Sequence, residues 1–172
     1  MLLKGKAHLF GKDVNTDDII ASKYKSSTTD MVEMSKYLMG NVDPDFVRRI
    51  APGDFIVAGS NFGCGSSRET APRVIKLAGL SAVLATGFAR IFFRNAINVG
   101  LPVVECDTSG IQEGDQLEAD LSAGLVRNLT RGTEIRVAPL PAVMLELLND
   151  GGLSEHFKKH GTFHLHSIEE GK

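Results

Sequence analysis

The stretch Asp54-Phe55-Ile56-Val57-Ala58-Gly59 (DFIVAG) is a short apolar run that ends in glycine. Two similar runs follow it, at 81–86 (SAVLAT) and 101–106 (LPVVEC). Runs of this kind, without alternating polar residues, are typical of strands buried on both faces of a sheet. Helix-like segments at about 71–78 and 89–98 separate the runs, and a glycine closely follows each one. The alternation predicts a right-handed parallel βαβαβ core.

The segments on either side of this core extend the prediction to an α/β fold with one domain over residues 1–172. Residues 5–10 are expected to add a strand before the core. A C-terminal antiparallel meander is expected after it, followed by a helix with proline near its start and glycine past its end. The predicted meander strands are 115–120, 125–128 and 134–137, the predicted helix is 141–150, and 22–35 is predicted to be a long loop.

The overall composition is that of an ordinary soluble globular protein, with 42% hydrophobic and 23% charged residues. A net charge of −2 argues against a general nucleic-acid-binding surface. The N-terminus lacks the apolar core of a signal peptide, and no apolar run approaches the roughly 20 residues that span a bilayer. Two cysteines, Cys64 and Cys106, are too few to hold an iron–sulfur cluster. We therefore expect a cytoplasmic protein without membrane or nucleic-acid partners.

The stretch at 59–69 (GSNFGCGSSRE) is the strongest candidate for chemistry, because it joins glycines, two hydroxyls and a guanidinium at the end of a predicted strand. Pro72 disfavours a helix that begins at the serines, so the helix is expected to start near Thr70 and to leave the loop free. Ligands bind at such strand ends in open α/β sheets. The loop lacks the lysine of a P-loop and does not fit the serine elbow of hydrolases. A tight turn with a solvated arginine stays open as the alternative.

Three further groups of polar residues have a structural as well as a chemical interpretation. Asp17 and Asp18 suit acid–base chemistry, metal binding or, by residue preference, the cap of a helix. Arg90 and Arg94 lie four apart on the second predicted helix, which is more typical of a solvated face than of an anion clamp.

The third group is a set of histidines near the C-terminus. His156 and His160 have a spacing that one face of a helix could offer to a metal, and His164 and His166 follow. No acidic or cysteine ligand joins them in the sequence, so we predict no metal site in this chain.

Taken together, three motifs resemble a known family. They are 15–19 (NTDDI), 63–69 (GCGSSRE) and 88–102 (FARIFFRNAINVGLP), and their order and spacing match the family from about Gly5 to about Val104. The sequence resembles the small subunits of 3-isopropylmalate dehydratase, which are similar to the swivelling C-terminal domain of aconitase. The resemblance implies a β/β/α swivelling domain that closes over a large subunit carrying a [4Fe-4S] cluster. It also implies a hydro-lyase reaction that moves a hydroxyl between neighbouring carbons of a hydroxy-dicarboxylic acid.

The resemblance also implies roles for individual residues. Ser66 matches the catalytic base, and backbone N–H groups around Gly65 and at the nearby helix N-terminus would stabilise its alkoxide. Ser67 and Arg68 match positions that hold a substrate carboxylate. Asp17 matches an acid that pairs with a histidine of the large subunit.

Substrate choice is expected to lie in the segment 37–40 (YLMG), where the tricarboxylate-using relatives present an arginine. Met39 at that position is apolar and suits an alkyl group, so the resemblance implies isopropylmalate and a place in leucine biosynthesis. The alternatives are a subunit acting on dimethylmalate, citramalate or a homoaconitate-type substrate. A different class of alternative is an anion-binding module without catalysis.

Overall fold

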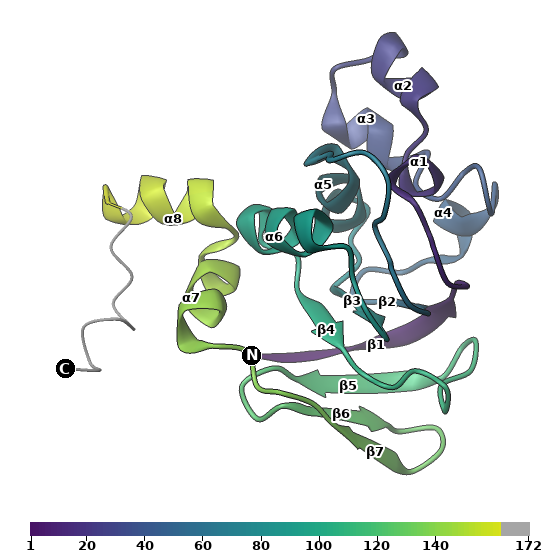
Figure 1. Cartoon of the computed structure of the whole chain (residues 1–172), viewed down its shortest axis with the longest axis vertical. Coiled ribbons are helices and arrows are strands. Elements are labelled where there is room, and N and C mark those ends of the chain that lie inside the picture. Colours follow the sequence, from purple (N-terminus) through teal and green to yellow (C-terminus); the bar gives the residue numbers. More distant parts are fainter. Residues whose placement is uncertain (163–172) are drawn as a thin grey trace.

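One seven-stranded sheet runs through the computed structural model, which describes residues 1–162 apart from the side chains of residues 25–27 (Figure 1). The strands lie in the order β4-β3-β2-β1-β5-β6-β7. Their bounds are β1 (Leu2–Leu9), β2 (Phe55–Ala58), β3 (Ala82–Ala85), β4 (Val103–Glu105), β5 (Gln116–Asp120), β6 (Leu125–Asn128) and β7 (Thr133–Arg136).

The sheet has a parallel half and an antiparallel half that meet at β1. The strands from β1 to β4 pair in parallel, and β1, β5, β6 and β7 pair antiparallel. Every residue of β2 and β3 is buried, as expected for apolar runs covered on both faces. The predicted parallel core and the predicted antiparallel meander are both confirmed.

Two longer helices connect the parallel strands. They are α5 (Thr70–Leu77), between β2 and β3, and α6 (Arg90–Val99), between β3 and β4. Pro72 is the third residue of α5, where its missing N–H interrupts no hydrogen bond, so the predicted start near Thr70 is confirmed. The predicted C-terminal helix is also present, as α7 (Ala142–Asp150). An eighth helix that the pattern did not predict, α8 (Leu153–His160), follows it, and α7 and α8 extend to one side of the body (Figure 1).

The prediction of a long loop over residues 22–35 was wrong, because two short helices lie there. They are α2 (Ser22–Ser27) and α3 (Met31–Ser35), and they follow α1 (Thr16–Ile19) and precede α4 (Phe46–Arg49). Asp30 caps α3 by accepting hydrogen bonds from the N–H groups of Val32 and Glu33. Met34 buries its side chain in the core. Helices of four to six residues are too short for apolar periodicity to reveal them.

Gly5 in β1 lies against the turn before β2. A Cβ placed there would lie 2.1 Å from the carbonyl oxygen of Gly53, which is backbone and cannot turn away. We expect Gly5→Ala to lower the free energy of unfolding by about 3 kcal/mol, at the upper end of overpacking effects. Urea unfolding followed by circular dichroism measures this. Gly110→Ala is the matched control, because a Cβ there has no neighbour within 4 Å. Equal stability of the two variants would contradict the prediction.

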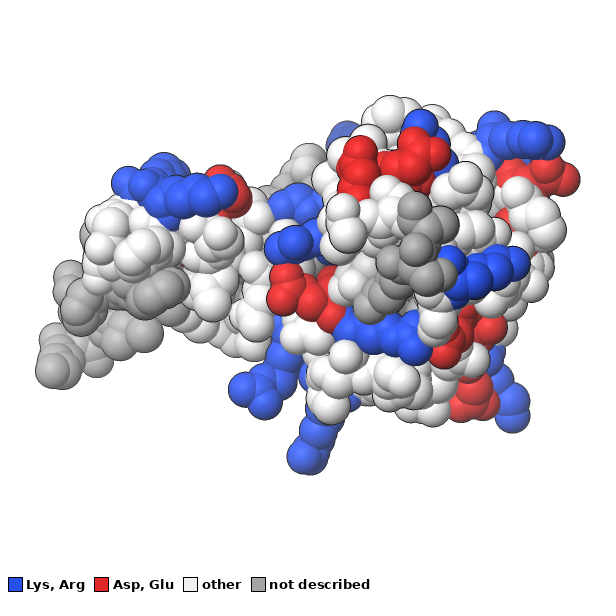
Figure 2. Space-filling view, turned by 90° about the horizontal axis from the view of Figure 1, so that it is seen from above, with Lys and Arg blue, Asp and Glu red and all other residues white. Residues whose placement is uncertain are grey.

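The surface mixes charges of both signs. Figure 2 shows acidic and basic side chains lying next to each other over the face that contains the short N-terminal helices. Among residues 1–162, no helix combines the length and the apolar character that crossing a bilayer requires.

Candidate active site

The loop that follows β2 is held by backbone hydrogen bonds from two distant segments. The N–H of Gly63 donates to the carbonyl of Val14 (2.7 Å), and the N–H of Phe62 donates to the carbonyl of Gly87 (3.0 Å). Gly63 has a φ of +78°, and a Cβ there would lie 2.1 Å from the ring of Phe92. The glycine therefore lets the loop pass against α6, and this fixes the residues that come next.

Ser66 and Ser67 are exposed, and they border a pocket of about 390 Å³. The hydroxyl of Thr16 donates a hydrogen bond to the carbonyl of Ser66 (3.1 Å) and ties the serine to the start of α1. The lining residues come from three segments of the chain: Thr16; then Gly63, Gly65, Ser66, Ser67 and Arg68; then Ala89, Arg90, Ile91 and Phe92. The motifs at 15–19, 63–69 and 88–102 thus meet in space. The sequence did not single out Thr16, although it lies within the first of these motifs.

Arg68 and Asp17 pair directly. The guanidinium donates from Nη1 to Oδ1 at 2.6 Å and from Nη2 to Oδ2 at 3.3 Å, so both carboxylate oxygens are engaged. The Arg68 side chain is only 17% exposed, whereas that of Asp17 is 49% exposed. A guanidinium has five N–H donors, so Arg68 keeps capacity for a second carboxylate beside Asp17.

The two neighbouring aspartates have different roles at α1. Asn15 is the N-cap residue, and Asp18 completes a capping box by accepting the N–H of Asn15 at 3.0 Å. The carboxylate of Asp17 instead faces Arg68 and the hydroxyl of Ser22, which donates to it at 2.7 Å. Capping therefore accounts for Asp18 and leaves the carboxylate of Asp17 to pair with Arg68, which lines the pocket.

The hydrogen bond from Ser22, followed by that from Arg68, holds the pKa of the Asp17 carboxyl below its ordinary value. Because the pKa is lowered in the folded state, ionised Asp17 adds stability above the ordinary aspartate range. That stability is lost as the pH falls through the lowered value. We expect Ser22→Ala to raise the pKa of Asp17, since it removes the largest cause of the shift. Carboxyl carbon chemical shifts, followed by NMR over an acid titration, measure this, and an unchanged pKa would contradict the assignment.

The N-terminus of α6 borders the same pocket. Its N-cap residue, Ala89, has no side chain that could cap the helix, so the N–H groups of the first turn have neither a capping nor an intrahelical partner. Such amides and the helix dipole favour an anion. Arg90 is exposed, as expected for a solvated face, and it also borders this pocket.

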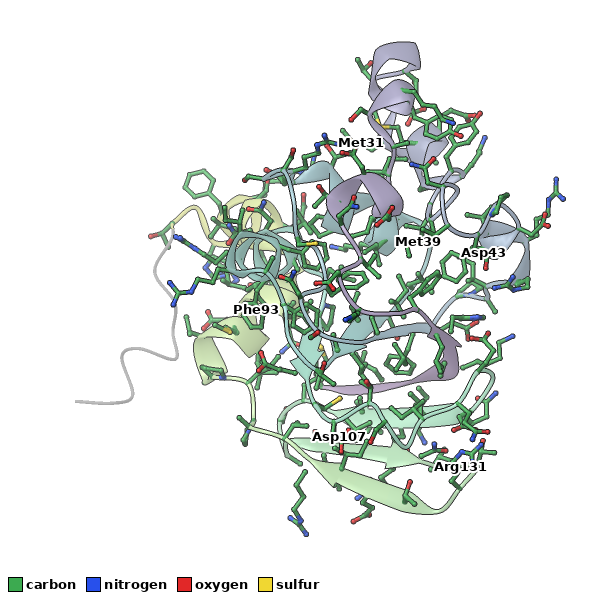
Figure 3. The ribbon with its side chains drawn as sticks, turned by 45° about the vertical axis from the view of Figure 1, so that its right-hand side comes forward. Met31, Met39, Asp43, Phe93, Asp107 and Arg131 are labelled. Atoms are coloured by element: carbon green, nitrogen blue, oxygen red, sulfur yellow. The ribbon has the colours of Figure 1, made fainter. Side chains whose placement is uncertain are left out.

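Met39 does not join this group, contrary to the prediction. Its side chain is fully buried in the core, and its N–H donates to the carbonyl of Ile19 at 2.9 Å (Figure 3). Met39 also has a φ of +58°, which is uncommon for a residue with a side chain. Contact between Met39 and a substrate would require this segment to leave the core. Its burial instead gives Met39 a packing role.

The two cysteines do not fit an iron–sulfur cluster. Burial raises the pKa of the Cys106 thiol to about 12. Cys64 is partly exposed, and burial, followed by the nearby charge of Asp13, raises its pKa as well. Cluster ligands are thiolates, and a cubane cluster takes up to four of them.

Comparisons with known proteins agree on one family. The aconitase C-terminal domain family matches residues 10–108. The 3-isopropylmalate dehydratase small subunit 2 of Archaeoglobus fulgidus is 56% identical over 165 residues, which cover 96% of this chain and 100% of the relative. The 3-isopropylmalate dehydratase small subunit 1 of Thermotoga maritima is 45% identical over 163 residues, which cover 94% of this chain and 98% of the relative. The crystal structure of 3-isopropylmalate dehydratase from Methanocaldococcus jannaschii superposes with a TM-score of 0.89 at 43% identity. The match covers 99% of this chain and 100% of that structure.

Proposed function

The chain belongs to the aconitase C-terminal domain family, and from this premise we propose that it is the small subunit of a 3-isopropylmalate dehydratase. The enzyme is a hydro-lyase of leucine biosynthesis that interconverts 2-isopropylmalate and 3-isopropylmalate by dehydration and rehydration. The observation that carries the proposal is the meeting of Ser66, Arg68 and the uncapped N-terminus of α6 around one pocket. Near-complete coverage of relatives at 45–56% identity supports it.

Ser66 acts as the base that removes a proton from the substrate carbon. A serine hydroxyl is a very weak acid, so its alkoxide needs strong electrostatic help. Two groups of donors are placed to give it: backbone N–H groups around Gly65 and the first-turn N–H groups of α6, which borders the same pocket. Donors that are already fixed in place cost no reorganisation during the reaction.

Arg68 and Ser67 hold one carboxylate of the substrate. Arg68 lies in the pocket lining with its guanidinium already oriented by Asp17, so little side-chain entropy remains to be lost when the substrate binds. Asp17 keeps nearly half of its side chain exposed, which leaves room for a histidine of the large subunit to reach it. The apolar residues Ala89, Ile91 and Phe92 line the same pocket and suit the alkyl part of the acid.

The metal centre belongs to the large subunit in this proposal, because the two thiols of this chain do not fit a [4Fe-4S] cluster. The small subunit supplies the base and the carboxylate-binding groups as one unit that closes over its partner. We place this assembly in the cytoplasm.

Co-expression with an iron–sulfur large subunit tests the proposal. We expect the two chains to purify together and to convert 2-isopropylmalate. The ultraviolet absorbance of the unsaturated intermediate measures this conversion. The small chain alone is the control and is expected to be inactive. Faster turnover of homocitrate, dimethylmalate or citramalate than of isopropylmalate would reassign the substrate, and failure to bind any such large subunit would overturn the proposal.

A further inference from the structure

Asp150, the last residue of α7, lies against two histidines of α8. Its Oδ2 is 2.7 Å from Nδ1 of His156 and 2.9 Å from Nε2 of His160. One nitrogen or oxygen from each of the three residues lies within 4.8 Å of the others. In the sequence, no acidic residue follows the helical spacing of the two histidines, and for that reason no metal site was predicted. The turn at Gly151 and Gly152, both with positive φ, brings Asp150 back onto α8.

The arrangement matches what a small transition ion requires. Two imidazole nitrogens and one carboxylate oxygen are a common ligand set for zinc. With metal–ligand bonds of about 2.0–2.1 Å, tetrahedral ligand atoms lie roughly 3.3 Å apart. The observed separations of 2.7 and 2.9 Å from Oδ2 would open by about half an ångström. The two imidazole nitrogens, which lie within 4.8 Å of each other, would settle at a similar separation.

The surroundings hold the three side chains in place. The side chains of Asp150 and His156 are 5% and 0% exposed, whereas that of His160 is 24% exposed. Lys159 donates to the other carboxylate oxygen, Oδ1, at 2.5 Å. A donor on Oδ1 fixes the direction of Oδ2, in the way that residues behind metal ligands orient them. The side chain of Lys159 is 63% exposed, so water can screen its charge.

One side of the group is accessible from outside. A pocket of about 390 Å³ is lined by both Asp150 and His160, together with Glu146 and Lys159. A fourth position on a bound ion would therefore open towards solvent and could be filled by water or a small anion.

We propose that Asp150, His156 and His160 form a binding site for zinc or a similar divalent transition ion. The ion takes the place of the protons between the histidines and Oδ2, and it fastens α8 to the end of α7. Each imidazole then carries its single N–H proton on its other ring nitrogen, and a second proton, where an imidazole is charged, is released to water. This site is separate from the pocket around Ser66, and its lining shares no residue with that pocket.

Zinc titration of the full-length chain, in competition with a chromogenic chelator, tests the site. We expect one zinc ion per chain and a higher melting temperature when it is bound. Cobalt is a second probe, and it is expected to give the visible absorption of a four-coordinate ion. His160→Gln removes the one ligand that is partly exposed, so the fold is expected to persist, and zinc affinity is expected to fall at least about tenfold.

Two matched variants decide where the ion binds. Lys158→Gln changes an exposed residue of the same helix and is expected to keep full affinity. His164 and His166 lie outside the described residues, so a variant with both changed to glutamine checks the contribution of that segment. Its affinity is expected to stay unchanged. Absence of zinc binding in the unaltered chain, or equal affinity after His160→Gln, would overturn the proposal and leave a hydrogen-bonded contact between helices.

Discussion

Replacing Ser66 by alanine is expected to lower kcat of the assembled enzyme by about 10²- to 10⁴-fold, the range typical for loss of a catalytic base. The hydroxyl is exposed at the pocket, whereas the hydrogen bond that anchors this residue uses its backbone carbonyl. Alanine keeps that carbonyl, so the loop and the contact with the large subunit are expected to persist. Steady-state kinetics on isopropylmalate, together with co-purification of the two subunits, measure both effects.

Two serine variants make the Ser66 result specific. Ser67→Ala removes the neighbouring hydroxyl and is expected to act mainly on KM, because Ser67 is assigned to carboxylate binding. Ser122→Ala changes a serine in the turn between β5 and β6, away from the pocket lining, and is expected to leave the kinetics unchanged. A Ser66→Ala enzyme that retains most of its kcat would rule out Ser66 as the base.

The core of the fold could be predicted because its signals are local. The runs that become β2 and β3 are apolar throughout, and Pro72 limits where α5 can start. The short helices α2 and α3 could not be predicted in this way, because neither is long enough to show a period. In α3, the capping aspartate Asp30 and the packing of Met34 in the core support the helix, whereas α2 has no side-chain cap.

The candidate site was only partly predictable because contacts between distant residues decide it. Asp17 and Arg68 were identified separately, but their pairing depends on how the loop after β2 lies against α1. Met39 was expected to face the substrate because the resemblance places it where the tricarboxylate-using relatives present an arginine. Its burial depends on contacts with distant parts of the chain, which the short segment around it does not reveal. Asp150 was overlooked as a neighbour of His156 and His160, because two glycines reverse the chain between them.

Replacing Arg68 by lysine is the second substitution with a large expected effect. Lysine keeps the positive charge but loses the planar fork that can engage Asp17 and a substrate carboxylate together. Loss of the charge-assisted hydrogen bonds to the substrate is expected to cost about 2–3 kcal/mol. This corresponds to a fall of about 30- to 150-fold in kcat/KM. We expect most of this fall in kcat/KM to appear as a higher KM, with little change in kcat. The reason is that a carboxylate remote from the reacting carbon is bound equally in the ground state and the transition state.

Arg73→Lys is the matched control for this prediction. Arg73 lies in α5 and pairs with Glu69 on the surface, and its side chain is 45% exposed, so the substitution is expected to leave kcat/KM unchanged. KM separates the two functions of Arg68. Loss of the paired hydrogen bonds raises the pKa of Asp17 in either case, whereas only loss of a substrate contact raises KM. An Arg68→Lys enzyme with unchanged KM but a raised Asp17 pKa would mean that Arg68 only positions Asp17. A raised KM is expected if the guanidinium itself holds the substrate.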